Sequence, residues 1–303
     1  MSYELREDEE CPGLDLFNTR AFQRLHETPR AACFTLRADG EPVAGAAFSQ
    51  AEEGVWRSPL RGSYGGFQFA LGARLDLAAS RALIAGVRER LRARRLELTL
   101  PPMVYRPQEI ACWLNELFLQ GFTVSRHELS CAIAIGAPFR DQLDSGNRKR
   151  LARCEREGLA FRELEAGGHR EAYEVVAQNR RERGFPITMT WPELSRMFET
   201  FPGRVRSFTV SRGARAIAAA VCMAVNQRVL YVFYWGELGE ARGLSPVTFL
   251  AAQLYALCQR EQFELLDLGT STEHGEPNAG LIRYKRALGA TESIKLWLSR
   301  GSE

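Results

Sequence analysis

The chain has 303 residues, of which 45% are hydrophobic and 25% are charged, and its formal net charge is +3. This composition is that of ordinary soluble globular proteins, and it excludes intrinsic disorder, collagen and small disulfide scaffolds. The length corresponds to about two domains of roughly 150 residues, and a net charge so close to zero gives no sign of a DNA partner. The basic residues are almost all arginines: of 40, only three are lysines, Lys149, Lys285 and Lys295.

The N-terminal ten residues contain five acidic side chains and no apolar stretch, the opposite of a secretory signal, so export is not expected. The longest uncharged apolar run, 216–225, is about half as long as a membrane-spanning helix, so no span is expected. The seven cysteines are odd in number and form no C-x-x-C pair. We therefore expect reduced thiols and a cytoplasmic protein.

A faint internal repeat aligns the segment that starts at Phe34 with the segment that starts at Phe208. In each half a predicted β-hairpin and a third strand come first, at 34–56 and 208–230. Each half then continues with a helix (78–94; 246–261) and a buried strand (96–100; 263–268). A second helix, which ends at Gly121 or Gly289, and a final strand (123–135; 292–298) complete the half. The same element order occurs twice, which predicts a mixed α/β (α+β) fold made of two copies of one domain.

Three more helices are predicted between the halves, at 141–157, 169–183 and 191–200, with a break at 184–186. The sequence contains no long linker, so we expect two tightly joined domains, 1–139 and 140–303, that share a cleft. Each domain is expected to be a twisted mixed sheet flanked by helices. The sequence leaves open whether the last strand stays with its own half or completes the sheet of the first domain.

Three strings resemble motifs of one known family. They are DLGTST at 267–272 followed by GLIRYKRALG at 280–289, SPLRGSYGG at 58–66, and NRRERGFP at 179–186. In this order they are similar to the signature of the FemAB-like branch of the GNAT superfamily. The resemblance covers both halves, and it implies two GNAT-like domains that transfer acyl groups to amines. Many members of that branch take an amino acid from aminoacyl-tRNA.

The chain departs from two patterns of the wider family. It has no heptad stretch long enough for the helical arm of some FemAB-like members. The segment 240–246 offers one glycine where the acetyl-CoA motif of ordinary GNAT enzymes has two, which disfavours cradling of the CoA pyrophosphate at this helix N-terminus. Aminoacyl-tRNA is therefore the favoured donor, and acyl-CoA is the alternative.

The predicted function is an acyltransferase that moves an aminoacyl or other acyl group onto an amine by direct attack in the cleft between the domains. A covalent intermediate is disfavoured because the sequence has no nucleophile motif such as G-x-S-x-G. The alternatives are an acyl-CoA-dependent N-acetyltransferase and a non-catalytic, ligand-binding GNAT-like module. No cofactor is expected to be required; the expected partners are a small or peptide-like amine acceptor and possible tRNA or acyl-CoA donors.

Lys285 is the main catalytic candidate, because it occupies the lysine position of the family motif in a chain that otherwise uses arginine. Amine acylation requires a developing oxyanion to be stabilised and protons to be moved. An ammonium group can do both because its pKa shifts readily, whereas a guanidinium group stays charged. The alternative is a chance lysine on a solvated helix face.

Asp267 and His274 are the other catalytic candidates. Asp267 ends a buried strand, where ligands of α/β proteins gather, and is expected to orient an amine or Lys285, or to cap the following turn. His274 lies in the loop that follows and is a candidate general base. No second histidine or cysteine lies at metal-ligand spacing from His274, so no metal site is expected.

Four residues of the second half are candidate substrate contacts. Tyr234 and Trp235 end a strand that, by the family resemblance, borders the acyl channel, although core packing is the alternative for both. Ser245 is predicted to cap the next helix, with proline at its first turn, and this helix N-terminus is a candidate anion site. Tyr284 is included because it precedes Lys285 in the motif.

Arg61, Tyr64, Gly65 and Gly66 are the candidate substrate-binding residues of the first half. Consecutive glycines allow a ligand to approach the backbone closely, and arginine pairs with phosphate or carboxylate. The resemblance implies that this region faces the acceptor, so Arg61 is expected to hold an anionic acceptor. A glycine bulge beside a solvated arginine is the alternative.

The helix between the halves is basic, with Arg148, Lys149, Arg150, Arg153 and Arg156. Such a cluster can contact the phosphates of tRNA or of a nucleotide. A solvated helix face is the simpler explanation.

Overall fold

The computed structural model describes residues 2–301 except residues 9, 11, 12, 27 and 29, so Cys11 lies outside the described residues. Contacts divide the chain into two units. Unit 1 consists of Met1–Leu129, Thr272–Glu276 and Ser293–Glu303, and unit 2 of Ser130–Ser271 and Pro277–Glu292. Two strands, β7 (Thr123–Ala134) and β15 (Thr291–Gly301), begin in one unit and end in the other.

The sheet of unit 1 contains six strands besides its parts of β7 and β15. They are β1 (Tyr3–Asp8), β2 (Ala31–Ala38), β3 (Glu41–Glu52), β4 (Val55–Ser58), β5 (Gly66–Phe69) and β6 (Arg95–Thr99). The strand order is β1-β2-β3-β4-β6-β15-β7, and β5 also pairs with β3. β4 and β6 are parallel, whereas β6 and β15 are antiparallel, so the sheet is mixed.

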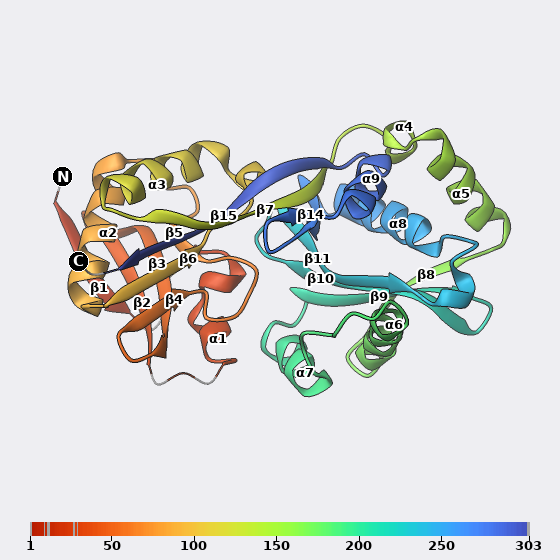
Figure 1. Ribbon diagram of the computed structural model, residues 1–303, viewed down its shortest axis with the longest axis horizontal. Coiled ribbons are helices and arrows are strands. Elements are labelled where there is room, and N and C mark those ends of the chain that lie inside the picture. The colour runs from red at the N-terminus through yellow and green to blue at the C-terminus, as the bar shows by residue number, and fades with distance from the viewer. Residues whose placement is uncertain (1, 9, 11–12, 27, 29, 302–303) are drawn as a thin grey trace. The chain divides into compact units, whose positions relative to one another are not determined.

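Two helices of unit 1, α2 (Leu77–Leu91) and α3 (Pro107–Leu119), pack against this sheet (Figure 1). α2 starts at Asp76, whose side chain accepts a hydrogen bond from the N–H of Ala78, and it ends at Arg92 in the left-handed conformation. The apolar side chains of the two helices form one core with residues such as Trp56 and Leu98. A short helix, α1 (Arg20–Gln23), contacts β2 and β3.

The strands of unit 2 are paired in the order β7-β12-β11-β10-β9-β8, in a mixed arrangement. Its strands are β8 (Ala160–Leu164), β9 (Val205–Arg212), β10 (Arg215–Ala224), β11 (Val229–Glu237) and β12 (Leu265–Thr270), together with the end of β7. β11 and β12 are parallel, and the other described pairs are antiparallel. A two-stranded ribbon, β13 (Thr272–Glu273) with β14 (Glu276–Pro277), follows β12.

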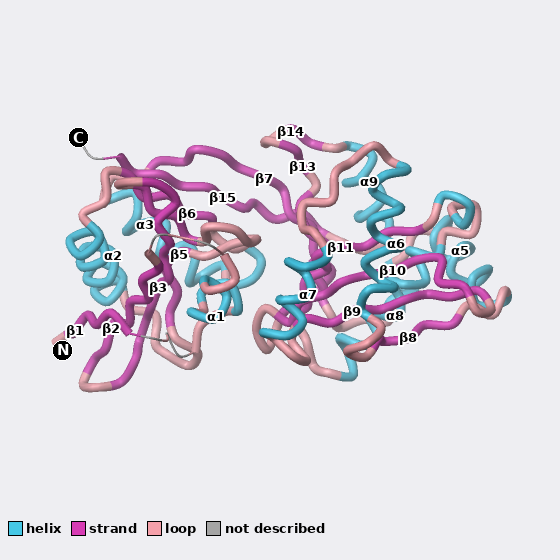
Figure 2. The backbone as a smooth tube through the Cα atoms, turned by 90° about the horizontal axis from the view of Figure 1, so that it is seen from below, coloured by secondary structure: helices cyan, strands magenta, loops and turns pink. Residues whose placement is uncertain are grey.

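The helices of unit 2 cover both faces of its sheet (Figures 1 and 2). They are α4 (Phe139–Gln142), α5 (Ser145–Arg156), α6 (His169–Glu182), α7 (Trp191–Thr200), α8 (Pro246–Arg260) and α9 (Ala279–Ala287). α6 and α8 both contact β9, β10 and β11, and Figure 1 shows them on opposite faces of these strands. α5 packs against α8. Within the described residues, no helix has the length and apolar character needed to cross a membrane.

The predicted α/β class and the predicted hairpins are confirmed. The β2–β3 turn has positive φ at Asp39 and Gly40, as a two-residue hairpin turn requires, and β9 pairs with β10 in the same way along the second half. Both helix ends predicted at glycine are also confirmed, since Gly121 and Gly289 have positive φ.

The sequence reading missed or misplaced some elements. It missed β1, β5 and β8, which are short strands of four to six residues. The helix predicted at 141–157 is wrong in its first turn, because Leu143 is extended and Asp144 caps a new helix by accepting a hydrogen bond from the N–H of Asn147. The chain therefore has two helices, α4 and α5, where one was predicted.

Candidate functional site

Strands β11 and β12 separate in the middle of the unit 2 sheet. They pair only from Val229 to Tyr231 on β11, opposite Leu265 to Asp267 on β12. Beyond that point β11 continues beside β10 to Glu237, and β12 continues beside β7. The facing edges of the two strands therefore stop sharing hydrogen bonds just where the DLGTST motif begins.

Lys285 is brought to this point by α9. The residue is 1% exposed, and its Nζ atom donates hydrogen bonds to the carbonyl oxygens of Gly269 (2.7 Å) and Thr270 (3.0 Å). Burial lowers the pKa of Lys285 to about 8, although the charges of Cys131 and Asp267 oppose this shift. The structure thus gives Lys285 a buried ammonium group that can lose its proton near neutral pH.

Asp267 fixes the turn that carries these two carbonyl groups. Its Oδ1 atom accepts hydrogen bonds from the N–H of Gly269 (2.7 Å) and from the hydroxyl of Ser130 (3.3 Å). Gly269 has a φ of +78°, which glycine adopts without strain. Asp267 therefore lies close enough to raise the pKa of Lys285, and it also holds the turn through Gly269. Both predicted roles, positioning Lys285 and capping the turn, have a physical basis.

Two further buried residues complete this cluster: Ser271 of the DLGTST motif, and Cys131, which the sequence did not single out. Cys131 on β7 lies 3.1 Å from the hydroxyl of Ser271, measured between Sγ and Oγ. Burial raises the pKa of the Cys131 thiol, and the nearby Lys285 charge opposes that shift. Nothing in the local sequence around Cys131 signals this position, because it depends on the pairing of β7 with β12.

A second missed residue, Tyr231, borders the cluster. Its ring lies next to Gly269, where an added Cβ atom would be 3.5 Å from the ring carbon Cε2. Tyr231 is half-buried on β11, on the same face as Phe233 and Trp235. The alternation along this strand identified that face, but no local pattern favoured Tyr231 over the residues nearer the strand end.

The N-terminus of α8 is already occupied by a carboxylate of the chain. The Oε2 atom of Glu237 lies 3.5 Å from the N–H of Val247 in the first turn, and Glu237 is 7% exposed. Burial raises the pKa of Glu237, whereas Arg183 and Arg242 oppose that rise. A second negative group at this helix end would be repelled by an ionised Glu237.

Ser245 and Pro246 hold the positions predicted for them at the start of α8, but the side chain of Ser245 does not cap the helix. Ser245 has a φ of +58°, and its hydroxyl donates to the carbonyl oxygen of Arg242 at 3.4 Å. The predicted serine cap is therefore wrong. The left-handed backbone at Ser245 turns its side chain away from the free N–H groups of α8.

The three aromatic candidates of unit 2 lie in different surroundings. Tyr234 is buried, and its hydroxyl is hydrogen-bonded to Thr188, with the guanidinium of Arg180 5.8 Å from its ring. Trp235 and Tyr284 are half-buried, and their ring centroids are 6.2 Å apart. Trp235 and Tyr284 thus form one aromatic surface at the β11–α9 side, and Tyr234 faces the opposite side of the sheet.

His274 is not part of the buried cluster. It is exposed, in the turn between β13 and β14, and its φ of +52° belongs to the left-handed region. Within the described residues, no group of three or more His, Cys, Asp or Glu side chains is arranged to hold a metal ion.

In unit 1 the structure gives Tyr64, Gly65 and Gly66 a packing role. Tyr64 is 1% exposed and donates a 2.9 Å hydrogen bond to Asp15. A Cβ atom on Gly65 would lie 2.7 Å from the backbone nitrogen of Pro59, so this glycine allows two stretches of the same chain to approach. Gly66 donates to the hydroxyl of Ser58 at 2.7 Å. Arg61, in contrast, is exposed.

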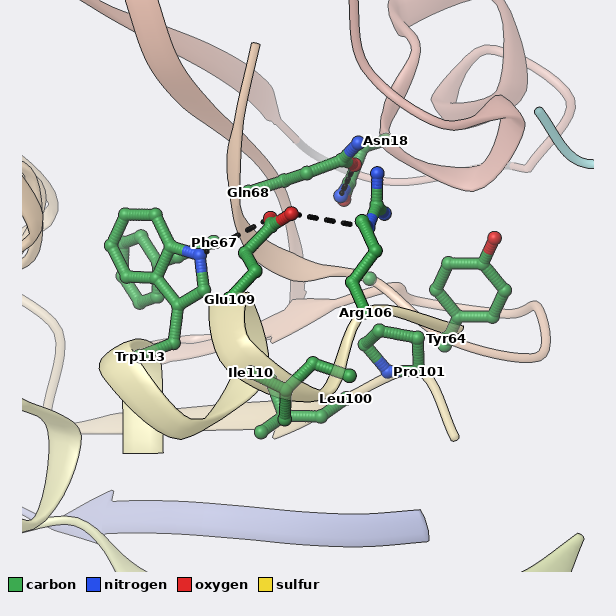
Figure 3. Close-up of a pocket in the computed structure, with 11 residues that line it drawn as sticks. Asn18, Tyr64, Phe67, Gln68, Leu100, Pro101, Arg106, Glu109, Ile110 and Trp113 are labelled. Carbon is green, nitrogen blue, oxygen red and sulfur yellow. Dashed lines mark hydrogen bonds and ion pairs between the residues drawn. The ribbon is translucent and has the colours of Figure 1, made fainter. Parts of the chain in front are cut away.

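Behind Tyr64 lies a small polar pocket centred on Arg106 (Figure 3). One guanidinium nitrogen of Arg106 is 2.5 Å from Asp15, and its Nε atom is 3.2 Å from Glu109. Gln68 accepts a hydrogen bond from the amide of Asn18 at 3.2 Å. The pocket measures about 10 Å³, enough for roughly one water molecule, so it is a structural polar network and has no room for an acceptor.

Comparisons with known proteins agree with this fold. Residues 145–286 match the family model described as an acetyltransferase (GNAT) domain. No curated protein matches the chain.

Three solved structures illustrate the structural likeness. FemX is 12% identical, with a TM-score of 0.76, and the match covers 99% of this chain and 97% of that chain. L-PGS from Bacillus licheniformis is 12% identical, with a TM-score of 0.57 and coverage of 88% and 83%. A tandem GNAT protein from the clavulanic acid biosynthesis pathway is 14% identical, with a TM-score of 0.52 and coverage of 91% and 84%.

The repeat, the motif strings and the comparisons point to one family. The matched domain is that of an acyltransferase, and it contains the β11–β12 separation and Lys285. Residues 145–286 therefore form a domain of the GNAT superfamily, and the chain as a whole shares its fold with FemX.

Proposed function

We propose that this protein transfers an aminoacyl group from aminoacyl-tRNA to an amine acceptor, with Lys285 acting on the reacting carbonyl. The observation that carries the proposal is the buried ammonium of Lys285, bound to Gly269 and Thr270 where β11 and β12 separate. A charge in such a dry environment interacts much more strongly with a developing oxyanion than it would in water.

The proposed step is a direct attack. The neutral amine attacks the acyl carbon, a C–N bond forms, and the ester C–O bond to the terminal ribose of the tRNA breaks. The electron pair of that bond stays on the ribose oxygen, which takes up a proton, while the attacking nitrogen loses one. Lys285, with a pKa of about 8, stabilises the oxyanion in its charged form and is able to relay the proton.

The surroundings of α8 support a donor other than acyl-CoA. Glu237 places a carboxylate at the first turn of this helix, where a pyrophosphate would have to bind to use the free N–H groups. On the neighbouring helix α5, Lys149 and Arg150 are exposed, and Arg153 donates to the carbonyl oxygen of Gly243 at 3.3 Å. These cations are available to the phosphates of a polynucleotide donor.

Solved structures of similar fold fit this proposal in general terms, since FemX and L-PGS share the two-unit architecture. The expected acceptor is a small or peptide-like amine. A cytoplasmic location would give the protein access to charged tRNA and remains part of the proposal.

Thermal stabilisation by charged tRNA and by acetyl-CoA tests the choice of donor. We expect charged tRNA to raise the melting temperature in a salt-dependent way, because phosphate contacts release counterions. Stabilisation by acetyl-CoA alone would replace the proposal by an acyl-CoA-dependent N-acetyltransferase. If neither donor binds, and variants of Lys285 keep the biological activity, the protein is a ligand-binding module.

A further inference from the structure

A groove lies on the face of the unit 1 sheet that α2 and α3 leave uncovered. Leu98 and Leu298 point to the core formed with these helices, so their neighbours Thr99 and Trp297, which are cross-strand partners, point to the other face. The groove there has a volume of about 410 Å³, which is within the usual range for small-molecule sites. All of its lining residues belong to unit 1.

Two cations surround the indole ring of Trp297. The guanidinium carbon of Arg126 lies 4.1 Å from the ring centroid, and the ammonium nitrogen of Lys295 lies 5.1 Å from it. Lys295 is 6% exposed, which is unusual for a lysine. Because a ring attracts cations to its faces, Trp297 holds the guanidinium of Arg126 at the groove, whereas Lys295 is buried and is not one of the lining residues.

Arg126 has hydrogen-bonding capacity that the chain does not use. Its nearest ion-pair partner is Glu128, whose Oε1 atom is 3.5 Å from Nε. Among the described residues, that buried Nε atom has no hydrogen-bond partner. The Arg126 side chain is 37% exposed, and a guanidinium placed over an indole ring is well suited to bind an anion.

Part of the groove lining is apolar. It is formed by Pro59 and Leu60, in the turn that follows β4. Arg57, at the same end, is already paired with Glu97 at 2.5 Å, so its charge is largely offset. The groove lining therefore combines apolar side chains with the guanidinium of Arg126.

We infer that this groove binds an organic anion, with its carboxylate or phosphate on Arg126 and its apolar part against Leu60. The inference stands apart from the proposed transfer reaction, because the groove lies within unit 1 and binding is measured without any donor or amine. A phosphate ester and a carboxylate share the recognition chemistry, and the probes below separate them.

The test uses the full chain and three small probes, namely benzoate, phenyl phosphate and the neutral benzyl alcohol. Binding is followed by the indole N–H signal of Trp297 in a ¹⁵N spectrum, assigned with the W297F variant. We expect one or both anions to shift this signal at concentrations of about 10 mM or below, and benzyl alcohol to leave it unchanged. A stronger shift with phenyl phosphate than with benzoate identifies a phosphate ligand, and the reverse identifies a carboxylate.

Variants locate the binding. Arg126→Gln should weaken binding of the preferred anion by about 10-fold or more, since hydrogen bonds to charged groups are strong. Leu60→Ala should weaken it less, and Arg74→Gln, which removes an exposed charge of unit 1 outside the groove, should not change it. The inference is overturned if neither anion shifts the Trp297 signal, if benzyl alcohol shifts it equally, or if Arg126→Gln behaves like Arg74→Gln.

Discussion

The Nζ atom of Lys285 donates a 2.7 Å hydrogen bond to the carbonyl oxygen of Gly269. This contact joins the two parts of the C-terminal signature, since Gly269 belongs to the DLGTST string and Lys285 to the helix α9 that follows it. The motif is therefore one structure, a lysine bound to the turn that ends β12. Replacing either part should affect the other.

Lys285→Arg and Lys285→Met should each reduce acyl transfer by at least about 100-fold, which is the usual cost of losing one oxyanion-stabilising group. Arginine keeps the charge but cannot lose it near neutral pH, and methionine removes it. The measurement is the rate of amide formation under single-turnover conditions. Arg74→Lys, at an exposed position of unit 1 outside the proposed site, is the control and should keep the wild-type rate. Near-normal transfer by Lys285→Arg would mean that the pKa of this residue has no role.

The lowered pKa of Lys285 also makes stability depend on pH. The folded pKa is about 8 and the ordinary value is 10.5, so the unfolded state binds more protons between these values. Burial of the charge therefore destabilises the wild type fully below about pH 8, and this cost is relieved as the pH rises toward 10.5. Relative to Lys285→Met, the wild type should gain about 3 kcal/mol over that window.

Urea unfolding of both proteins at several pH values from 7 to 10 measures this difference. Other groups titrate in both proteins, so their contributions cancel. If the difference in unfolding free energy between the wild type and Lys285→Met does not change with pH, Lys285 is not a buried group that titrates in this range.

Asp267→Asn should shift the pH dependence of transfer. The amide can still accept the hydrogen bond from the N–H of Gly269, so the turn should remain. The Asp267 charge raises the pKa of Lys285, and its loss should move the limb of the pH–rate profile that reports Lys285 to lower pH. A lower rate with an unchanged pH profile would show that Asp267 acts only by holding the turn.

The cysteines should be largely unreactive in the folded protein. Burial raises the pKa of Cys154 to about 11 and of Cys258 to about 12, and thiolates are the reactive form. Of the described cysteines, all but the half-buried Cys112 are buried. In a Cys11→Ser variant we therefore expect a thiol reagent to label Cys112 alone, and all six remaining cysteines in urea. Rapid labelling of Cys131 in the native state would contradict the buried cluster around Lys285.

Arg106 should be essential for the stability of unit 1. Its removal leaves the buried carboxylates of Asp15 and Glu109 without their cation, which typically costs about 3–5 kcal/mol. Arg106→Leu should therefore lower the melting temperature strongly and increase hydrogen exchange in α3 and β5. The exposed Arg74→Gln is the control, and an equally small effect of both variants would show that the network contributes little.

The sequence predicted the parts of the fold that have strong periodic signals. Turns and helix caps can be predicted because they depend on local backbone conformation. Asp39 and Gly40 mark a hairpin turn in this way, and Gly289 marks the end of α9. Short strands such as β8 have no such mark, because their pairing with β9 depends on tertiary contacts.

The site was predictable only where a motif names a residue. Lys285 was found because it is a rare lysine at a family position. Strand pairing brings Cys131 and Tyr231 to the site, and Glu237 reaches α8 from the end of β11. No local sequence pattern distinguishes these three residues from core residues. Tyr64 is the opposite case: the motif marked it as a substrate contact, but in the structure it is a buried hydrogen-bond donor to Asp15.

The central claim is that Lys285 promotes transfer from aminoacyl-tRNA to an amine. The most direct test follows loss of a labelled amino acid from charged tRNA in the presence of hydroxylamine, a small nucleophile that needs no acceptor recognition. We predict that the wild type and Arg74→Lys accelerate the reaction above the uncatalysed rate, and that Lys285→Met does not. Equal rates for the wild type and Lys285→Met, or consumption of acetyl-CoA with the charged tRNA left intact, would contradict the claim.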